Sequence, residues 1–305
     1  MNLLISGGTG FLGKYIYRHW KSNGYSVDSV GRGNSNEIVC DISKDELILK
    51  KDYEYFIHCA GKAHTIPKTN IEVNEFYLVN EIGTVSFLNA INQQKNKPKG
   101  VLIISTVAVY GLTEGTLINE KASLTAKDAY GKSKINAEKI AIDWGKNNNI
   151  NISVLRLPLV VGKNAPGNLL AMINGIKNGK YLNIGGGKAK KSMVLATDVA
   201  SFSSKVINTS GIYNLTDTKH PNFFQISNVI ANNFKVKNVL NIPMFVAQIL
   251  VFFIKIINIF LKTKIPFTIM TLKKMTNDLT FDDKKAQEIG WKPSCIINNG
   301  HEWLK

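Results

Sequence analysis

Short apolar runs alternate with longer amphipathic stretches over the first half of the chain. The runs predict strands, and the stretches, in which apolar residues recur every three or four positions, predict helices. In chain order the predicted elements are a strand at 2–6, a helix at 11–24, strands at 25–30 and 53–61, a helix at 74–94, a strand at 99–111, a helix at 129–148 and a strand at 150–158. Such alternation is typical of a parallel sheet with helices on both faces. The pattern therefore predicts an α/β fold, a doubly wound parallel sheet of the Rossmann type.

The alternation loosens after residue 158, where shorter and more mixed elements follow. We expect residues 1–158 to form a dinucleotide-binding domain. Residues 193–215, which have the pattern of a helix and one more strand, are expected to return to that domain. The remaining segments, 159–192 and 216–305, are expected to form a smaller C-terminal α+β domain that binds the substrate.

One apolar segment, residues 242–261, has about the length that a membrane-spanning helix needs. Gln248, Lys255 and Asn258 interrupt it, and a lysine near the centre of a span is costly in lipid. A buried or amphipathic helix of the second domain is therefore the favoured interpretation. Contact with a membrane surface, helped by the basic charge of the chain, stays open as a second interpretation.

The composition describes a folded and strongly basic protein. The chain has 305 residues, 44% of them hydrophobic and 20% charged, with a net charge of +16. A basic field attracts anions such as nucleic acids, acidic lipids and nucleotide-bearing small molecules. The lysines are spread along the sequence and form no dense block with interleaved aromatic residues, so we expect no nucleic-acid partner.

The cysteines and the N-terminus restrict the cellular setting. Cys40, Cys59 and Cys295 lie far apart, so we expect neither a disulfide framework nor a metal site. The opening residues "MNLLISGG" lack the basic region, the full apolar region and the cleavage pattern of a signal peptide. A cytoplasmic location is the expectation.

Three glycines follow the first predicted strand directly. Gly7, Gly10 and Gly13 have the spacing Gly-x-x-Gly-x-x-Gly and open the first predicted helix. Glycines at this place let the backbone approach a pyrophosphate, whose negative charge the helix N-terminus favours. The stretch therefore predicts a dinucleotide-binding turn.

The residues after the second strand bear on which dinucleotide binds. An acidic residue about 20 positions after the glycines usually binds the ribose 2′-hydroxyl of NAD. Here Gly31 and Arg32 occupy that place, and Asp28 lies earlier, within the strand. A guanidinium can pair with the 2′-phosphate of NADP. NADP(H) is therefore favoured, and NAD(H) stays open.

The stretch "YGKSK", residues 130–134, offers an acid–base pair. On a helix Tyr130 and Lys134 lie on the same face, because they are four positions apart. A free tyrosine has a pKa of about 10, and a neighbouring cation lowers that pKa. We therefore expect Tyr130 to act as acid and base, with Lys134 lowering its pKa.

Taken together, the motifs resemble those of extended short-chain dehydrogenases/reductases of the nucleotide-sugar epimerase and dehydratase group. In chain order they are "GGTGFLG", "CDIS", "IHCAGKAH", "VNEIGT", "STVAVYG", "YGKSK" and "RLPLVVG". The resemblance covers nearly the whole chain and implies a nicotinamide cofactor. Besides the three glycines and Arg32, the residues that it assigns to cofactor binding are Phe11, Leu12, Asp41, Ile42, Ala60, Gly61, Asn80, Ser105, Tyr130, Lys134 and Pro158.

The same resemblance implies the catalytic residues. Thr106 stands at the position of the family's catalytic hydroxyl and, with Tyr130, contacts the substrate; Ser105 beside it could take that place instead. Lys134 completes the catalytic set. One departure is Val161, which stands where the family usually has a tyrosine.

The later chain resembles the substrate segment of bacterial UDP-4-keto-6-deoxy-N-acetylhexosamine 4-reductases, which serve surface-polysaccharide synthesis. The resemblance implies that Asn168 and Lys191 bind the nucleotide diphosphate, which needs cations and amide donors. An exposed basic turn at Lys190 and Lys191 is the alternative.

The function implied is an NADP(H)-dependent reductase of a UDP-linked 4-keto-6-deoxy-N-acetylhexosamine. An NAD-dependent UDP-hexose or UDP-N-acetylhexosamine 4-epimerase, which would use the same catalytic residues, is the alternative. A 4,6-dehydratase is disfavoured, because Val107 and Ala108 stand where that group has an acidic pair. A binding protein without activity is disfavoured by the intact Tyr130–Lys134 pair. The resemblance also implies a homodimer formed through two long helices.

Overall fold

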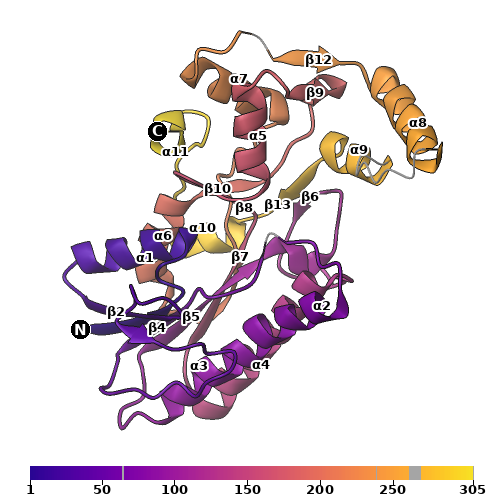
Figure 1. Ribbon diagram of the computed structural model, residues 1–305. Coiled ribbons are helices and arrows are strands. Elements are labelled where there is room, and N and C mark those ends of the chain that lie inside the picture. The colour runs from indigo at the N-terminus through magenta and orange to yellow at the C-terminus, as the bar shows by residue number, and fades with distance from the viewer. Residues whose placement is uncertain (64, 238, 261–268, 305) are drawn as a thin grey trace.

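A computed structural model describes residues 1–305 except 64, 238, 261–268 and 305. Its central sheet has seven parallel strands in the order β11-β7-β5-β4-β1-β2-β3, which confirms the predicted doubly wound fold (Figure 1). The strands are β1 (Asn2–Ser6), β2 (Ser26–Gly31), β3 (Ile38–Val39), β4 (Tyr55–His58), β5 (Gly100–Thr106), β7 (Ile152–Leu157) and β11 (Gly211–Asn214). All seven are parallel, so their carboxyl ends meet at one edge, where ligands of such folds bind.

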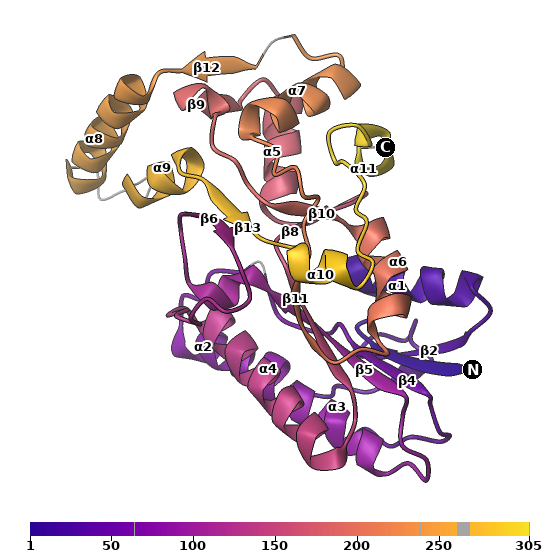
Figure 2. The same cartoon turned by 180° about the vertical axis from the view of Figure 1, so that it is seen from behind.

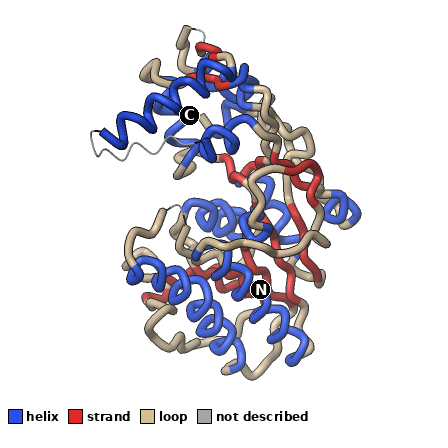
Figure 3. Tube along the Cα trace, turned by 90° about the vertical axis from the view of Figure 1, so that its right-hand side faces the viewer, coloured by secondary structure: helices blue, strands red, loops and turns tan. Residues whose placement is uncertain are grey.

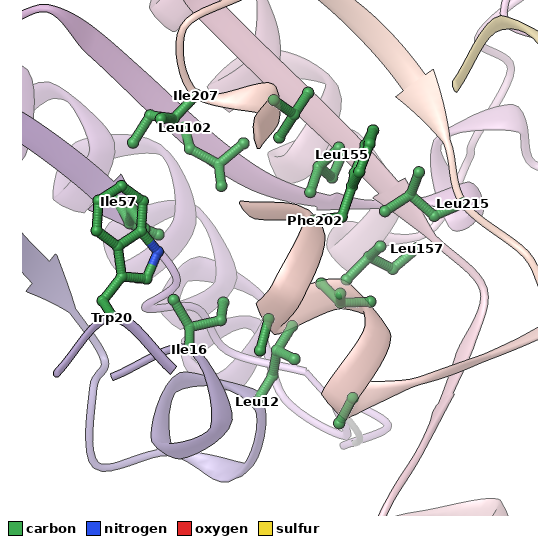
Figure 4. Packing of buried hydrophobic residues seen from close by; sticks show 14 of the residues in the cluster. Leu12, Ile16, Trp20, Ile57, Leu102, Leu155, Leu157, Phe202, Ile207 and Leu215 are labelled. Atoms are coloured by element: carbon green, nitrogen blue, oxygen red, sulfur yellow. The ribbon is translucent and has the colours of Figure 1, made fainter. Parts of the chain in front are cut away.

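Helices cover both faces of this sheet (Figures 1 and 2). One face carries α1 (Phe11–Ser22) and α6 (Ala196–Val206), and the other carries α2 (Asn70–Tyr77), α3 (Gly83–Asn92) and α4 (Ala129–Asn148). Figure 4 shows the first of these layers, in which Trp20 of α1 lies beside Ile57 of β4 and Phe202 of α6 lies beside Leu155 of β7. Trp20 Nε1 also donates to Ser203 Oγ at 2.8 Å, so the indole nitrogen is satisfied within the core.

Two predicted elements differ from the structure near the edge that carries the motifs. The helix predicted at 74–94 is α2, a π-helical turn η1 (Leu78–Ile82) and α3. The strand predicted at 99–111 ends at Thr106, and Val107–Tyr110 forms the 3₁₀ turn η2. The side chain of Thr106 accepts a hydrogen bond from Ala108 N at 3.1 Å, which caps this turn and stops the strand.

Most of the remaining elements form a second lobe above the sheet (Figure 3), whereas Ala286 and Trp291 pack into the sheet core beside α6. Three two-stranded parallel pairs contribute: β8 (Leu159–Val161) with β10 (Met193–Leu195), β9 (Leu182–Ile184) with β12 (Leu240–Ile242), and β6 (Gly115–Ile118) with β13 (Leu279–Phe281). The helices of the later chain are α5 (Asn168–Lys177), α7 (Phe223–Asn233), α8 (Met244–Phe260), α9 (Ile269–Thr276), α10 (Lys284–Glu288) and α11 (Gly300–Trp303). This lobe has a core of its own around Leu169, Ile226, Ile230 and Trp303. The chain returns once to the central sheet, where β11 pairs with β7.

The apolar segment at 242–261 forms β12 in part and then the helix α8, while residue 261 lies outside the described residues. Within the part of the chain that the structure describes, no helix is both long and apolar enough to cross a membrane.

Candidate active site

The glycine turn brings the backbone of three elements into close contact. Gly7 has φ +71°, and a Cβ built on it would lie 2.7 Å from Ala60 N, which follows β4. A Cβ on Gly13 would lie 2.0 Å from the carbonyl oxygen of Gly7. Gly10 caps α1 with no side-chain hydrogen bond, and the first turn of α1 holds no acidic residue. The turn therefore fits a pyrophosphate, for which it offers amide donors and the positive end of a helix dipole.

The two residues after Gly10 differ in where they lie. Leu12 is buried in the sheet core, so only its backbone faces the turn. Phe11 is half-buried, and its ring meets Tyr15 edge-on at a centroid distance of 5.8 Å. A Cβ on Gly162, after β8, would lie 3.1 Å from the Phe11 ring, so Phe11 joins the turn to the second lobe.

Arg32 follows β2 at the carboxyl edge of the sheet and is exposed. Its guanidinium forms no ion pair within 4 Å in the described part of the chain. Burial raises the pKa of Asp41, but hydrogen bonds from Ser43 and the charge of Arg32 hold that pKa below its ordinary value. Ile42 is buried beneath them in the core. Asp28, by contrast, binds Lys51 and Tyr53.

Ala60 and Gly61 follow β4, and Asn80 supports them from the π-helical turn η1. Ala60 N donates to Ser6 Oγ at 3.2 Å, and the Asn80 side chain binds Lys62 N and Lys62 O at 2.7 and 3.1 Å. Asn80 Nδ2 also donates to Ser133 Oγ of α4 at 2.9 Å. Asn80 is fully buried, so the structure places its amide as a support of the loop, not at a free surface.

Thr106 and Ser105 point to opposite sides of β5, as neighbouring residues of a strand must. Ser105 is buried and its hydroxyl donates to Glu138. The Thr106 hydroxyl lies beside Tyr130, whose pKa its hydrogen bond lowers. The structure therefore brings Thr106, and not the side chain of Ser105, to Tyr130.

The predicted effect of Lys134 on the pKa of Tyr130 stays a prediction, and the structure shows which other groups act on that phenol. Burial raises the pKa of Tyr130, and the charge of Asp128 raises it too, while Thr106 is the group that lowers it. Lys134 is buried and its Nζ donates to Ile104 O at 2.7 Å. The ammonium of Lys134 is therefore held at the backbone of β5, on the helix that also carries Tyr130.

Sequence reasoning missed a buried ion pair directly behind this site. Glu138 of α4 and Arg156 of β7 pair at 2.6 Å, with both side chains at most 3% exposed. Arg156 Nη1 also reaches Tyr110 Oη at 3.1 Å. Glu138 stands four residues after Lys134, and its charge opposes the lowering of the Lys134 pKa that burial causes. The pair thus fixes α4 and β7 relative to each other.

The two residues predicted to bind the nucleotide diphosphate lie in the second lobe. Asn168 is exposed at the first position of α5, after the cap residue Gly167. Lys191 is half-buried, and its Nζ donates to Asn277 O at 2.8 Å. Burial lowers the pKa of Lys191. Pro158 joins β7 to β8 at the carboxyl edge, between the sheet and this lobe.

Comparisons with known proteins agree with this architecture. The family described as the NAD dependent epimerase/dehydratase family matches residues 3–216. A sterol-4-alpha-carboxylate 3-dehydrogenase (decarboxylating) of Dictyostelium discoideum is 27% identical over 99% of both chains. A GDP-6-deoxy-D-talose 4-dehydrogenase of Aggregatibacter actinomycetemcomitans is 30% identical over 44% of this chain and 45% of its own length.

Among solved structures, the UDP-N-acetylglucosamine 4-epimerase of Methanobrevibacter ruminantium in complex with UDP-N-acetylmuramic acid has a TM-score of 0.77. It is 17% identical and aligns over 99% of this chain and 96% of its own. At this identity the likeness shows the fold.

The fold and the ordered motifs at its carboxyl edge define an extended short-chain dehydrogenase/reductase, an enzyme of the nucleotide-sugar epimerase and dehydratase group. The chain belongs to the NAD dependent epimerase/dehydratase family.

Proposed function

We propose that the protein is an NADP(H)-dependent reductase of a UDP-linked 4-keto-6-deoxy-N-acetylhexosamine, a precursor of surface polysaccharide. The observation that carries the proposal is the placement of the Thr106 hydroxyl beside Tyr130 at the sheet edge that also carries the glycine turn. The relative that acts as a 4-dehydrogenase of a 6-deoxy sugar supports the choice of C4. The exposed guanidinium of Arg32 supports NADP(H).

Each residue of the site has a separate role in this reaction. NADPH, when bound along the glycine turn, supplies the hydride. Tyr130 gives its proton to the C4 oxygen of the sugar as that oxygen becomes a hydroxyl, and Thr106 donates a hydrogen bond that orients the oxygen. Asn168 and Lys191 hold the diphosphate from the second lobe.

The alternative is an NAD-dependent UDP-hexose or UDP-N-acetylhexosamine 4-epimerase. The likeness in fold to a UDP-N-acetylglucosamine 4-epimerase favours it. An epimerase takes a hydride from C4 and returns it to the opposite face, so it keeps its dinucleotide and consumes none. The reductase therefore consumes one NADPH for each sugar that it reduces, whereas the epimerase has no net consumption of its dinucleotide.

The division into a dinucleotide-binding domain (1–158 with 193–215) and a substrate domain also stays a proposal, as does the homodimer. Exposed side chains on α4, among them Lys132, Asn136 and Lys139, leave one face of that helix open to solvent in the single chain. Analytical ultracentrifugation of the protein measures the oligomeric state directly.

Cofactor preference is the first test. The purified protein is denatured, any released dinucleotide is identified, and the Kd of NADPH and NADH is measured for the wild type. A clear preference for NADPH that Arg32→Ala abolishes, while the matched exposed control Arg18→Ala retains it, supports the reductase. Tightly held NAD contradicts it and favours the epimerase.

Turnover is the second test. The protein is given NADPH with a UDP-4-keto-6-deoxy-N-acetylhexosamine, and NADPH oxidation is followed by absorbance. Tyr130→Phe is expected to lower kcat/KM by about a hundredfold or more, because the proton donor is lost. Tyr25→Phe, at the opposite end of the sheet, is the matched control and keeps the wild-type rate. Equal rates for the two variants would contradict the role of Tyr130.

A further inference from the structure

Helix α8 is apolar on two faces, and the described part of the protein covers only one of them. Ala247 and Val251 are buried against Ile184 of β9 and Leu272 of α9, with Met244 at the edge of the same cluster. This face fixes α8 to the second lobe.

The other face of α8 is exposed at the side chains that the structure describes there. Phe245, Ile249, Phe252 and Phe253 are between 51% and 63% exposed. Their spacing of four, three and one residues places them on one side of the helix, opposite Ala247 and Val251. In Figure 1 the helix stands at the outer end of the second lobe, away from the sheet. Contiguous exposed apolar surface of this kind marks a docking surface.

The charge around this surface has one sign. Residues 218–277 contain eight lysines and no aspartate or glutamate, so this segment carries half of the net charge of +16. Lys273 and Lys274 are exposed on α9, which packs against α8. Lys188 is exposed next to the 3₁₀ turn η3 (Gly185–Gly187), which also contacts α8. An apolar stripe within a wholly basic segment has the chemistry of a helix that lies on an anionic membrane.

We propose that the exposed face of α8 docks on the surface of a membrane that contains anionic lipid. The apolar side chains enter the boundary between headgroups and acyl chains, and Lys188 and the lysines of α9 pair with lipid phosphates. A second copy of the chain fits less well. A two-fold interface brings the same patch of both copies together, and here it would set two basic segments against each other without an acidic partner. The proposal is independent of which sugar the enzyme reduces.

The test measures flotation of the full-length protein with vesicles, without substrate. The vesicles contain phosphatidylcholine alone or phosphatidylcholine mixed with phosphatidylglycerol. The loss variant is F245S/F252S, and the matched control is V39S/I48S, which removes two exposed apolar side chains from the other lobe. In a second measurement Phe252→Trp reports the local environment by fluorescence, with Ile48→Trp as its control. Circular dichroism verifies that each variant is folded.

The wild type is expected to float with the phosphatidylglycerol vesicles and to be released by salt, which screens the lysines. F245S/F252S is expected to bind at least about tenfold more weakly, while V39S/I48S binds as the wild type. The emission of the Phe252→Trp variant moves to shorter wavelength on vesicles, and that of the Ile48→Trp control does not.

Three results would overturn the proposal. The first is no flotation of the wild type, and the second is equal binding to both kinds of vesicle, which removes the role of charge. The third is a wild-type dimer that F245S/F252S converts to a monomer, which assigns the face to a second copy of the chain.

Discussion

At the scale of single residues, burial, a hydrogen bond from Thr106 and the charge of Asp128 act on the pKa of Tyr130. Burial raises the pKa of its phenol, and the hydrogen bond from Thr106 lowers it, because that bond stabilises the phenolate. In the direction of sugar oxidation Tyr130 must be a phenolate, so this rate rises with pH through the pKa of Tyr130.

Thr106→Val should therefore move this rising limb to higher pH. The variant removes the hydrogen bond that favours the phenolate, and Thr106→Ser, which keeps a hydroxyl, should restore the limb. The measurement is the pH profile of kcat for oxidation of the 4-hydroxy sugar with NADP⁺. A limb that stays at the wild-type pH in Thr106→Val would show that Thr106 does not act on the phenol.

Asp217 provides a prediction about stability. Its side chain is 2% exposed, and its Oδ1 accepts from His220 N at 2.9 Å, while Oδ2 has no hydrogen-bond partner in the described part of the chain. Burial raises its pKa from the ordinary 3.8 to about 6. Below the pKa of the unfolded state this carboxyl is protonated in both the folded and the unfolded protein, so it does not lower the free energy of unfolding there. The free energy of unfolding then falls as pH rises from about 4 through about 6.

Asp217→Asn removes this titration. The variant should match the wild type at pH about 4 and exceed it by about 2–3 kcal/mol above pH 7, since one pKa unit corresponds to about 1.4 kcal/mol. Urea unfolding at several pH values measures the difference, and the exposed Asp143→Asn is the control. A difference that does not change with pH would contradict the assignment to Asp217.

At the scale of elements, the buried Glu138–Arg156 pair holds α4 on β7. Glu138→Gln leaves the Arg156 guanidinium buried without its carboxylate, and should lower the free energy of unfolding by about 3–5 kcal/mol. The exposed Glu46→Gln should change it by no more than about 0.5 kcal/mol. Replacing both members by E138L/R156M should cost less than Glu138→Gln alone, because no charge is left unpaired. The reverse order, from thermal or urea unfolding, would contradict this explanation.

The glycine turn makes a second prediction at this scale. Gly→Ala within a helix usually gains up to about 1 kcal/mol. At Gly13 the sign should reverse, because the new Cβ would lie 2.0 Å from the Gly7 carbonyl oxygen, a backbone atom that cannot rotate away. We expect Gly13→Ala to lower the melting temperature and to weaken NADPH binding at least about tenfold, whereas Gly33→Ala, whose Cβ meets nothing nearer than 3.9 Å, should leave both unchanged. A normal NADPH affinity in Gly13→Ala would exclude the turn as the pyrophosphate site.

The sequence pattern predicted these elements well wherever hydrophobic periodicity is strong. The helix predicted at 129–148 is α4 (Ala129–Asn148), and the strand predicted at 2–6 is β1 (Asn2–Ser6). The π-helical turn at Leu78–Ile82 was not predicted, because one extra residue in a turn scarcely changes the apolar spacing. It brings Asn80 under the loop after β4, a consequence of tertiary packing.

The site residues that could be predicted from the sequence are those that lie in recognisable motifs, whose order along the chain is typical of the family. Tyr130, Thr106 and the glycines fall at one edge of the sheet, as the alternation of strands and helices requires. The Glu138–Arg156 pair has no motif, because it joins two elements through side chains that only the packed sheet brings together. The same holds for Lys134, since helical spacing could not show that its ammonium binds Ile104 O.

At the scale of the whole molecule, the sheet lobe and the second lobe differ in their charge and in the site residues that they carry. The sheet lobe carries the glycine turn, Tyr130 and Thr106, and the second lobe carries Asn168, Lys191 and a basic segment without acidic residues. A nucleotide sugar held between such lobes has its sugar at the sheet edge and its diphosphate against cations and amides. Because this arrangement places the sugar beside the glycine turn and Tyr130, the central expectation is a hydride transfer to the sugar.

The transfer of deuterium from NADPH labelled at C4 of the nicotinamide tests this expectation most directly. The protein is incubated with the labelled NADPH and a UDP-4-keto-6-deoxy-N-acetylhexosamine, and the product is examined by mass spectrometry and NMR. We predict one deuterium at C4 of the sugar for each NADPH consumed, with Tyr130→Phe far slower than the wild type. A protein that interconverts UDP-N-acetylhexosamines without consuming NADPH, and leaves C4 unlabelled, would contradict the reductase and establish the epimerase in its place.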